Sequence, residues 1–367
     1  MVTDERHEAI LRLLRLEGSI KVSEVAERLG VSAVTVRHDV RELAGRGLLK
    51  RIHGGATLLQ GPRAADPAQA PEADAPPAGT RAGQGPVFGM VVPHASYYYP
   101  EVIKGAQAAA GARGARVVLS VSRYDLEEDR ARVGELLAAG VDGLLLTPRW
   151  NPASSAETGR WLESLDVPVI LVERRAGFES GDVEQVASDH VFGAYLAVRH
   201  LARLGHEHVA MLAREESLTT PWLCEGYERA LRSFGLRRAE PRLLLGSRDD
   251  DPAGVDAQLE EFAGLAKAED VRAVLVHNDY DAIELVRRLR ARGLDVPRDI
   301  ALVTYDDEVA TMGDVPLTAV APPKQAVGAE AVELLMRRMG EPAGPRRQVL
   351  LRPELRVRAS CGADSGS

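Results

Sequence analysis

Short apolar runs alternate with helical patterns over most of this chain, and no other feature restricts the fold as strongly. The apolar runs are VFGMVVP, VVLSVS, GLLLTP, PVILV, HVAML, AVLVHN and IALVTYD. Helical patterns between them cover residues 102–114, 127–140, 192–205, 226–234 and 279–293. Strands and helices that alternate in this way predict an α/β fold, in which parallel sheets carry helices on both faces.

The series of strands is too long for one small sheet, and the pattern starts again after Asp189. With 367 residues, the chain is expected to form more than one folding unit. We therefore predict a body of two doubly wound α/β lobes with a cleft between them. Ligands of such sheets bind beyond the carboxyl ends of the strands, so the cleft is the predicted ligand site.

A segment rich in proline, alanine and glycine separates this body from a small head. Residues 60–86 read QGPRAADPAQAPEADAPPAGTRAGQGP and contain almost nothing that a core could bury. Such a composition predicts a flexible linker. We expect a head at 1–59, the linker at 60–86, a body at 87–358 and a disordered tail at 359–367.

Charge is divided unevenly between these parts. Residues 1–60 contain 10 Lys and Arg against 8 Asp and Glu, whereas the rest contains 36 against 46. A mildly positive head on a negative body predicts two separate tasks. The two cysteines, Cys224 and Cys361, have no metal-ligand spacing, and we expect no metal and no cofactor. The first residues lack a signal peptide and no apolar run could span a bilayer, so a cytoplasmic protein is expected.

The head has the pattern of three helices followed by a hairpin. The helices are expected at residues 8–16, 23–29 and 32–44, and the hairpin is expected to turn at Gly54-Gly55. Ser32 is the predicted N-cap of the third helix. On that helix Val36, Val40 and Leu43 share one face, which predicts packing against the first two helices.

The opposite face of the third helix is predicted to meet DNA. A short helix, a tight turn and a basic second helix form a helix-turn-helix, whose second helix enters the major groove. Arg can contact guanine bidentately, and Ser or Thr can reach bases or phosphates. The basic hairpin would form a wing over the adjacent backbone. The alternative is an ordinary solvated helix face. The candidate DNA-binding residues are Ser32, Val34, Thr35, Arg37, His38, Arg41, Lys50, Arg51 and His53.

The same residues carry a family resemblance. Residues 6–59, with S-x-x-T-V-R-x-D from Ser32 to Asp39 and H-G-G-A from His53, closely resemble the DeoR-type winged helix-turn-helix. That family commonly has a second basic residue after the Arg. Here the position is His38, which implies a contact that is weaker or dependent on pH.

The body resembles the effector domain of the LacI family, which has the periplasmic-binding-protein fold. The matching segments include FGMVVPHASYYYPEVIKGAQAAA, VASDHVFGAYLAVRHLARLGHEHVAML and AVLVHNDYDAIELVRRLRARGLDVPRDIALVTYDD. The chain would thus join a DeoR-like head to a LacI-like sensor. The resemblance implies lobe 1 at about 87–172 and 318–339, and lobe 2 at about 173–317 and 340–358.

The resemblance also implies the residues that would bind a small effector. Ser96, Tyr98 and Tyr99 match the loop after the first strand, and Glu173-Arg174 match an acidic–Arg pair that grips vicinal hydroxyls. Asp279 matches an Asp that faces the ligand. Each has a plainer interpretation: a loop packed on its own lobe, a solvated pair, or an N-cap. Asp125, before Glu128, is interpreted as a helix cap; Asp306 and Asp307 stay ambiguous.

Three departures from the LacI pattern bear on the effector and on signalling. Leu223 stands where an Arg is common, with Trp222 beside it as a further ligand candidate, and Pro322 stands where a Gln is common. A standard sugar is therefore not assured, and a glycoside, disaccharide, polyol or nucleoside is also open. The third departure is the linker, which lacks the short hinge helix of that family.

These features together predict a ligand-responsive transcriptional regulator. It would bind double-stranded operator DNA as a homodimer, since helix-turn-helix pairs read two half-sites, and repression is the sign that the resemblance implies. The alternatives are a solute-binding protein and a sugar- or nucleoside-processing enzyme. The sequence has no nucleophile elbow, zinc spacing or Walker-type loop, so we expect no enzyme.

Overall fold

The computed structural model divides the chain into two compact units, Met1–Thr80 and Arg81–Ser367. In the second unit it describes residues 85–149, 155–175, 182–238, 243–246, 251–268 and 271–363. In the first it describes residues 10, 19–21, 25–26, 28, 31, 35–36, 40, 43, 49–52 and 55–57. The predicted linker at 60–86 therefore lies almost wholly outside the described residues.

The head is built around a small apolar core. Ile10, Val25, Ala26, Val36, Val40 and Leu43 are helical and buried, and they pack with the buried side chains of Ile20 and Leu49. The structure therefore confirms the predicted inward face of the third helix. Helix residues recur within all three predicted helical segments.

A three-stranded antiparallel sheet completes the described part of the head. Its strands are β1 (Ser19–Lys21), β2 (Lys50–Ile52) and β3 (Gly55–Thr57), in the order β1-β3-β2. Ile52 pairs with Gly55, so Gly55 belongs to β3 rather than to the predicted turn. The sequence analysis also missed β1, because three residues are too few to show an alternating pattern.

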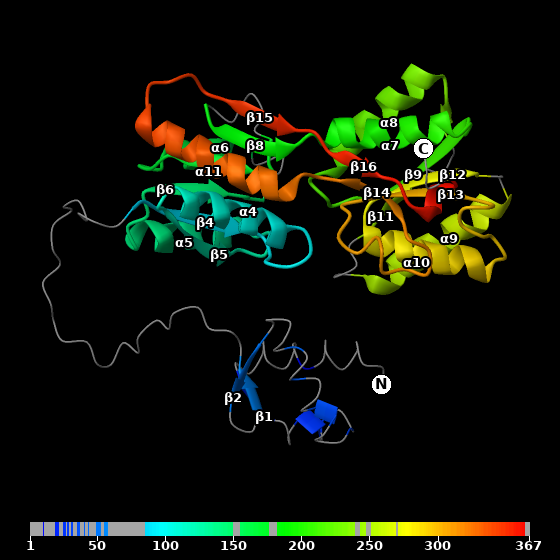
Figure 1. Ribbon diagram of the computed structural model, residues 1–367, viewed down its shortest axis with the longest axis horizontal. Coiled ribbons are helices and arrows are strands. Elements are labelled where there is room, and N and C mark those ends of the chain that lie inside the picture. Colours follow the sequence, from blue (N-terminus) through cyan, green and yellow to red (C-terminus); the bar gives the residue numbers. More distant parts are fainter. Residues whose placement is uncertain are drawn as a thin grey trace, which may run out of the picture. The chain divides into compact units, whose positions relative to one another are not determined.

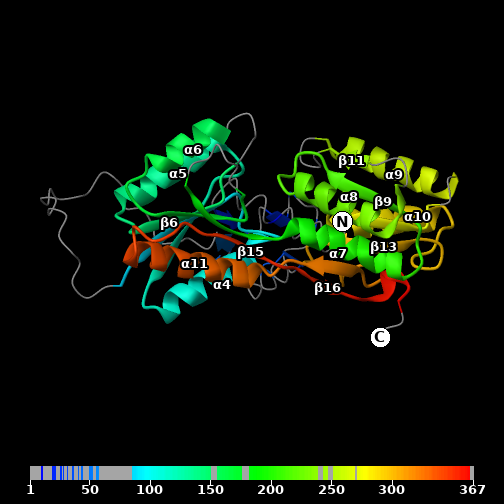
Figure 2. The same ribbon diagram turned by 90° about the horizontal axis from the view of Figure 1, so that it is seen from above.

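Lobe 1 is a parallel sheet between two pairs of helices (Figures 1 and 2). Its order is β15 (Gln348–Leu351), β8 (Glu184–Ser188), β7 (Val169–Val172), β6 (Gly143–Leu146), β4 (Val87–Val92) and β5 (Arg116–Val121). Helices α4 (Tyr99–Ala112) and α11 (Lys324–Gly340) cover one face. Helices α5 (Leu126–Ala138) and α6 (Ser155–Glu163) cover the other.

Lobe 2 repeats this plan. The sheet contains β9 (His208–Arg214), β10 (Arg237–Arg238), β11 (Leu243–Leu245), β12 (Ala273–Val276), β13 (Ala301–Tyr305), β14 (Thr318–Ala321) and β16 (Glu354–Arg356). Helices α7 (His190–Arg203) and α8 (Thr220–Phe234) cover one face, and α9 (Pro252–Ala268) and α10 (Asp279–Ala291) the other. Among the described strands of lobe 2, only the β14–β16 pair is antiparallel.

The chain crosses between the lobes three times, and this corrects the predicted lobe boundaries. The crossings lie between β8 and α7, between β14 and α11, and between β15 and β16. Strands β8 and β15 therefore belong to lobe 1, and β14 belongs to lobe 2, each opposite to the prediction. The restart of the pattern at Asp189 does coincide with the first crossing.

The C-terminal segment also differs from the prediction. Ala359–Cys361 form a 3-10 helix, η3, rather than part of a disordered tail. Ser360 is fully buried, and its hydroxyl is paired there: it donates to Leu302 O at 2.6 Å and accepts from Thr318 N at 2.8 Å. Residues 364–367 lie outside the described part. None of the helices in the described part has the length and apolar character needed to cross a membrane.

Candidate functional site

A cavity of about 670 Å³ opens between the two lobes. Its lining comes from the segments that follow β4, β5, β6, β7 and β8 of lobe 1, and β9, β11, β12 and β13 of lobe 2. These are the carboxyl ends of parallel strands, where ligands of doubly wound sheets bind. The cavity is therefore the predicted interlobe cleft.

Glu173 is the most strongly coordinated polar side chain in the cleft. It follows β7 at φ 51°, and its Oε1 accepts from Tyr98 Oη at 2.7 Å and Ser188 Oγ at 2.8 Å. Its Oε2 accepts from Ser188 N at 3.0 Å and lies 3.4 Å from His190 Nε2. Burial opposes ionisation of this carboxyl, but its hydrogen bonds, those from His190 foremost, outweigh it and lower the pKa. The cleft thus contains a buried, ionised carboxylate.

Tyr97 joins the two lobes across the cleft. This lobe 1 residue has φ 56°, and its hydroxyl donates to Asp306 Oδ2 in lobe 2 at 3.1 Å. Its ring also lies 5.1 Å from the ring of Tyr280 in lobe 2. Burial raises the pKa of Asp306, although Lys324, His190 and Tyr97 all favour its charged form.

Two basic side chains of lobe 2 face the cleft in different charge states. Arg214 is held by Asp281, with Nε–Oδ2 and Nη2–Oδ1 distances of 2.8 and 3.1 Å. His277 is buried, and the burial and the charge on Arg214 lower its pKa to about 3. His277 is therefore neutral at physiological pH and can act as both donor and acceptor.

Two buried nitrogen atoms at the cleft have no hydrogen-bond partner within the described structure. One is His277 Nδ1 and the other is Arg174 Nη2. Arg174 otherwise donates to backbone oxygens, from Nε to Pro148 at 2.6 Å and from Nη1 to Glu173 at 2.7 Å, and from Nη1 to Tyr99 Oη at 3.5 Å. Because a buried polar group without a partner costs free energy, these atoms are suited to a polar ligand.

Asp279 serves the protein rather than the cleft surface. Its side chain is fully buried and accepts from Thr304 Oγ1 at 3.0 Å, Glu308 N at 2.6 Å and Val309 N at 3.0 Å. Burial and the charge of Asp306 raise its pKa to about 6. The N-cap of α10 is Asn278, so Asp279 is neither that cap nor, in this structure, part of the cavity lining.

The structure brings four of the seven predicted effector residues together and separates three. Tyr98, Tyr99, Glu173 and Arg174 line the cleft. Within the described lining of this cleft, Ser96, Trp222 and Asp279 do not occur. Ser96 is exposed, with its carbonyl oxygen 2.9 Å from His94 Nδ1, while Trp222 lines a different cavity.

The two departures from the LacI pattern that concern the effector also lie away from the cleft. Leu223 is fully buried in the core beneath α8, and Pro322 is buried at the crossing between β14 and α11. Neither belongs to the described cleft lining, so they do not by themselves make the cleft less polar.

Several cleft residues were missed or left open by the sequence analysis. Tyr97, Tyr124, Arg149, His190, Arg214, His277, Asn278 and Asp306 all line the cavity. Most of them follow an apolar run within a few residues, which is the signal that could have found them. Asp307, left ambiguous, instead pairs with Arg356 at 2.7 Å and Arg358 at 2.6 Å. Asp125 caps α5 as predicted, since it accepts from Glu128 N at 2.8 Å.

The predicted DNA-binding residues fall largely outside the described structure. Ser32, Val34, Arg37, His38, Arg41 and His53 are not described. Thr35 lies in a helix and is half-buried, and Lys50 and Arg51 lie in β2. Two of the predicted wing residues therefore lie in a strand, and the DNA contacts remain a prediction.

Two family models match the chain. A DeoR-like helix-turn-helix domain matches residues 6–61, and a periplasmic binding protein-like domain matches residues 198–361. These matches agree with the resemblances seen in the head and the body.

Individual relatives match most of the chain. The HTH-type transcriptional regulator CelR of Thermobifida fusca is 32% identical over 258 residues, which cover 69% of this chain and 73% of that protein. The arabinose metabolism transcriptional repressor of Geobacillus stearothermophilus is 26% identical over 92% of this chain and 89% of its own length. A solved complex of the transcriptional regulator CelR with cellobiose has a TM-score of 0.65 at 24% identity, over 93% of this chain and 99% of that one.

Proposed function

The chain belongs to the LacI family of DNA-binding transcriptional regulators, and from this we propose that it is a repressor whose affinity for operator DNA is changed by a small neutral sugar bound between its lobes. The head would bind the operator and the cleft would bind the sugar. The effector acts because it binds one arrangement of the lobes better than another.

The observation that carries this proposal is the set of polar groups around Glu173. The ionised, buried carboxylate of Glu173 orients Tyr98, Ser188 and His190 at the cleft, and Arg174 and His277 each bring an unused nitrogen to the same cavity. Tyr97 and Tyr124 add aromatic surface, which suits the apolar faces of a sugar ring. A cavity of about 670 Å³ has room for a mono- or disaccharide.

The relatives guide the choice of effector. One is a repressor of arabinose metabolism, and a solved relative contains cellobiose. The alternative of a solute-binding or sugar-processing protein is not favoured, because these relatives are transcriptional regulators. We also propose that the chain acts as a homodimer, since helix-turn-helix pairs read two half-sites. Sedimentation equilibrium of the full chain tests this, and a monomer at all concentrations contradicts it.

Operator binding and sugar binding can be tested separately. The operator is first selected from random DNA with the full chain, and its affinity is measured by fluorescence anisotropy. Arabinose, ribose, glucose, cellobiose and adenosine are then added in turn. We expect one sugar to change the operator Kd by about 5- to 150-fold. If adenosine alone changes the operator Kd, the effector is a nucleoside rather than a sugar.

Paired variants assign the two tasks to two sites. Arg37→Ala is expected to abolish specific operator binding while calorimetry still detects the sugar. Glu173→Gln is expected to abolish sugar binding while specific operator binding is kept. Tyr98→Phe is expected to weaken sugar binding although the carboxylate is still present. The controls are Arg15→Ala in the head and Glu207→Gln, whose side chain is 81% exposed in the body. Sugar binding that survives Glu173→Gln in a folded protein would exclude this cleft.

A further inference from the structure

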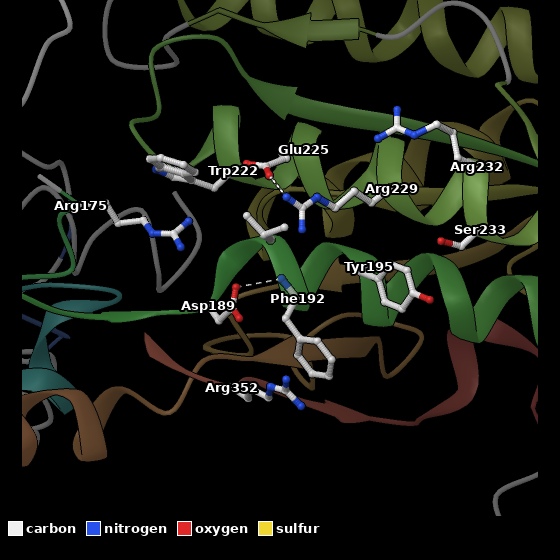
Figure 3. A pocket seen from close by; sticks show the side chains of 11 residues that line it. Arg175, Asp189, Phe192, Tyr195, Trp222, Glu225, Arg229, Arg232, Ser233 and Arg352 are labelled. Atoms are coloured by element: carbon white, nitrogen blue, oxygen red, sulfur yellow. Dashed lines mark hydrogen bonds and ion pairs between the residues drawn. The ribbon is translucent and has the colours of Figure 1, made fainter. Parts of the chain in front are cut away.

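A second cavity, of about 650 Å³, is lined by arginine and aromatic side chains (Figure 3). Its main walls are α7 and α8 of lobe 2. Arg175, which follows β7 of lobe 1, and Arg352, which lies in the crossing between β15 and β16, complete it. Figure 3 shows the side chains of Arg175 and Arg229 entering the cavity from opposite sides.

The lining has more positive than negative charge. The guanidinium groups are those of Arg175, Arg229, Arg232 and Arg352, and the carboxylates are those of Asp189 and Glu225. Glu225 pairs with Arg229, and Asp189 caps α7 by accepting from Phe192 N at 3.1 Å. Within the described part of the chain, the other three arginines have no carboxylate partner.

Two of these arginines are held in place by aromatic rings. The Arg175 guanidinium lies 4.3 Å from the centroid of the Trp222 ring, and that of Arg352 lies 4.5 Å from the Phe192 ring. A stacked guanidinium keeps the N–H groups in its plane free, so it can still form bidentate hydrogen bonds with an oxyanion. The rings therefore orient the donors before any ligand arrives.

We propose that this cavity binds the phosphoryl group of a small phosphorylated metabolite, at a site separate from the interlobe cleft. Several planar donors around one opening match the three oxygens of a phosphoryl group better than a single carboxylate. The cavity has the volume of a small-molecule site, whereas a DNA contact would need a far more extended surface. Trp222, which sequence analysis assigned to the sugar site, here orients an arginine.

The position of the cavity gives the ligand a regulatory effect, which rests on the proposed function. Arg175 belongs to lobe 1, Arg229 belongs to lobe 2, and Arg352 lies in a crossing between them. A phosphoryl group bound to residues of both lobes favours the arrangement in which those residues face each other. It would therefore change operator affinity independently of the sugar.

Calorimetry on the full chain tests binding with glycerol 3-phosphate and inorganic pyrophosphate as probes, and with glycerol as the uncharged control. We expect both phosphorylated probes to bind and to raise the melting temperature. The double variant Arg175→Gln/Arg352→Gln should weaken their binding by about tenfold or more, because it removes charge-assisted hydrogen bonds. Arg352→Lys, which keeps the charge but not the planar donors, should retain only part of the affinity.

The control variants separate this site from the cleft and from general charge effects. Arg203→Gln removes an exposed positive charge from α7 outside the cavity and should leave probe binding unchanged. Glu173→Gln alters the cleft and should also leave it unchanged. The proposal is overturned if neither probe binds, if the double variant binds normally, or if Arg203→Gln weakens binding as much. Because calorimetry needs no operator, failure of the proposed repressor function would appear separately, as unchanged DNA binding with sugar.

Discussion

Three carboxylates at the ends of neighbouring elements differ in charge behaviour because their contacts differ. Hydrogen bonds from His190, Ser188 and Tyr98 overcome the burial of Glu173 and lower its pKa. Asp306 is buried with fewer compensating contacts, and its pKa is raised. Asp279 feels both burial and the charge of Asp306, which raise its pKa to about 6. Residue type alone would have predicted one behaviour for all three.

His277 is expected to make the folded protein less stable in mild acid. Its pKa is about 3 in the folded state and 6.5 in the unfolded state, so only the unfolded chain binds a proton between these values. Stability contributed by neutral His277 is present above pH 6.5 and is lost as the pH falls. At pH 5 the loss is about 2 kcal/mol. Denaturant unfolding at pH 7 and pH 5 should show a smaller drop for His277→Gln; an equal drop assigns the acid sensitivity elsewhere.

Asp279→Asn is expected to affect stability rather than sugar affinity. Glu308 N and Val309 N both donate to Oδ2, which an amide oxygen can replace, but Thr304 Oγ1 donates to Oδ1, where the amide would place an NH2 group that cannot accept. Leaving a buried donor without a partner costs about 1–3 kcal/mol. Unfolding in urea measures this cost. Asp281→Asn is not a suitable control, because it would also remove the partner of Arg214. A large loss of sugar affinity at unchanged stability would return Asp279 to the effector site.

Helices α4 and α11 approach each other so closely that glycine is required on both. A Cβ at Gly105 would lie 2.0 Å from Gln325 O, and one at Gly328 would lie 1.9 Å from Val102 O. Both contacts are with backbone atoms, which cannot move without shifting a helix. The two glycines thus allow α4, near the start of lobe 1, to pack directly against α11, which returns to lobe 1 after β14.

Gly105→Ala should therefore destabilise the protein by about 1–3 kcal/mol or more. Gly111→Ala is the matched control on the same helix, because a Cβ there meets nothing within 4 Å. That control should stabilise the protein by about 0.5–1 kcal/mol through helix propensity. Urea unfolding of the two variants should thus move in opposite directions. Similar stabilities would show that the helices can separate at little cost.

The two lobes are held in their observed arrangement by few described contacts across the cleft. Tyr97 donates to Asp306 and its ring packs on Tyr280, and Lys324 at the start of α11 donates to Asp306 O and to Glu308. The three crossings supply the covalent connection. A ligand that adds contacts to both lobes can shift such an equilibrium with modest binding energy.

Tyr97→Phe should shift the lobes away from the observed arrangement. The variant keeps the ring but loses a hydrogen bond worth about 1 kcal/mol, or about fivefold in population. Sugar affinity should fall by that factor, and small-angle X-ray scattering without sugar should show a larger radius of gyration. Tyr280→Phe is the control, since it also loses a hydroxyl from the stacked pair. An unchanged radius of gyration would mean that Tyr97 affects sugar affinity only through direct contact with the ligand.

The sequence by itself determined the architecture and the class of protein. Apolar runs that alternate with helical patterns lead to parallel sheets, because only such strands are buried on both faces, and the buried stripe at Val36, Val40 and Leu43 followed from helical periodicity. The resemblances in the head and body agree with the matching family models. Tyr98, Tyr99, Glu173 and Arg174 were also found, since each follows a strand or matches a motif.

Only the tertiary structure decided which strands belong to which lobe and which side chains face the cleft. Strands β8, β14 and β15 lie in the lobes opposite to the predicted ones, because strand pairing depends on distant partners. Trp222 and Asp279 carry suitable chemistry, yet one stacks on Arg175 and the other binds the loop after β13. Local sequence limits what a side chain can do, whereas packing against remote elements determines which of those roles it takes.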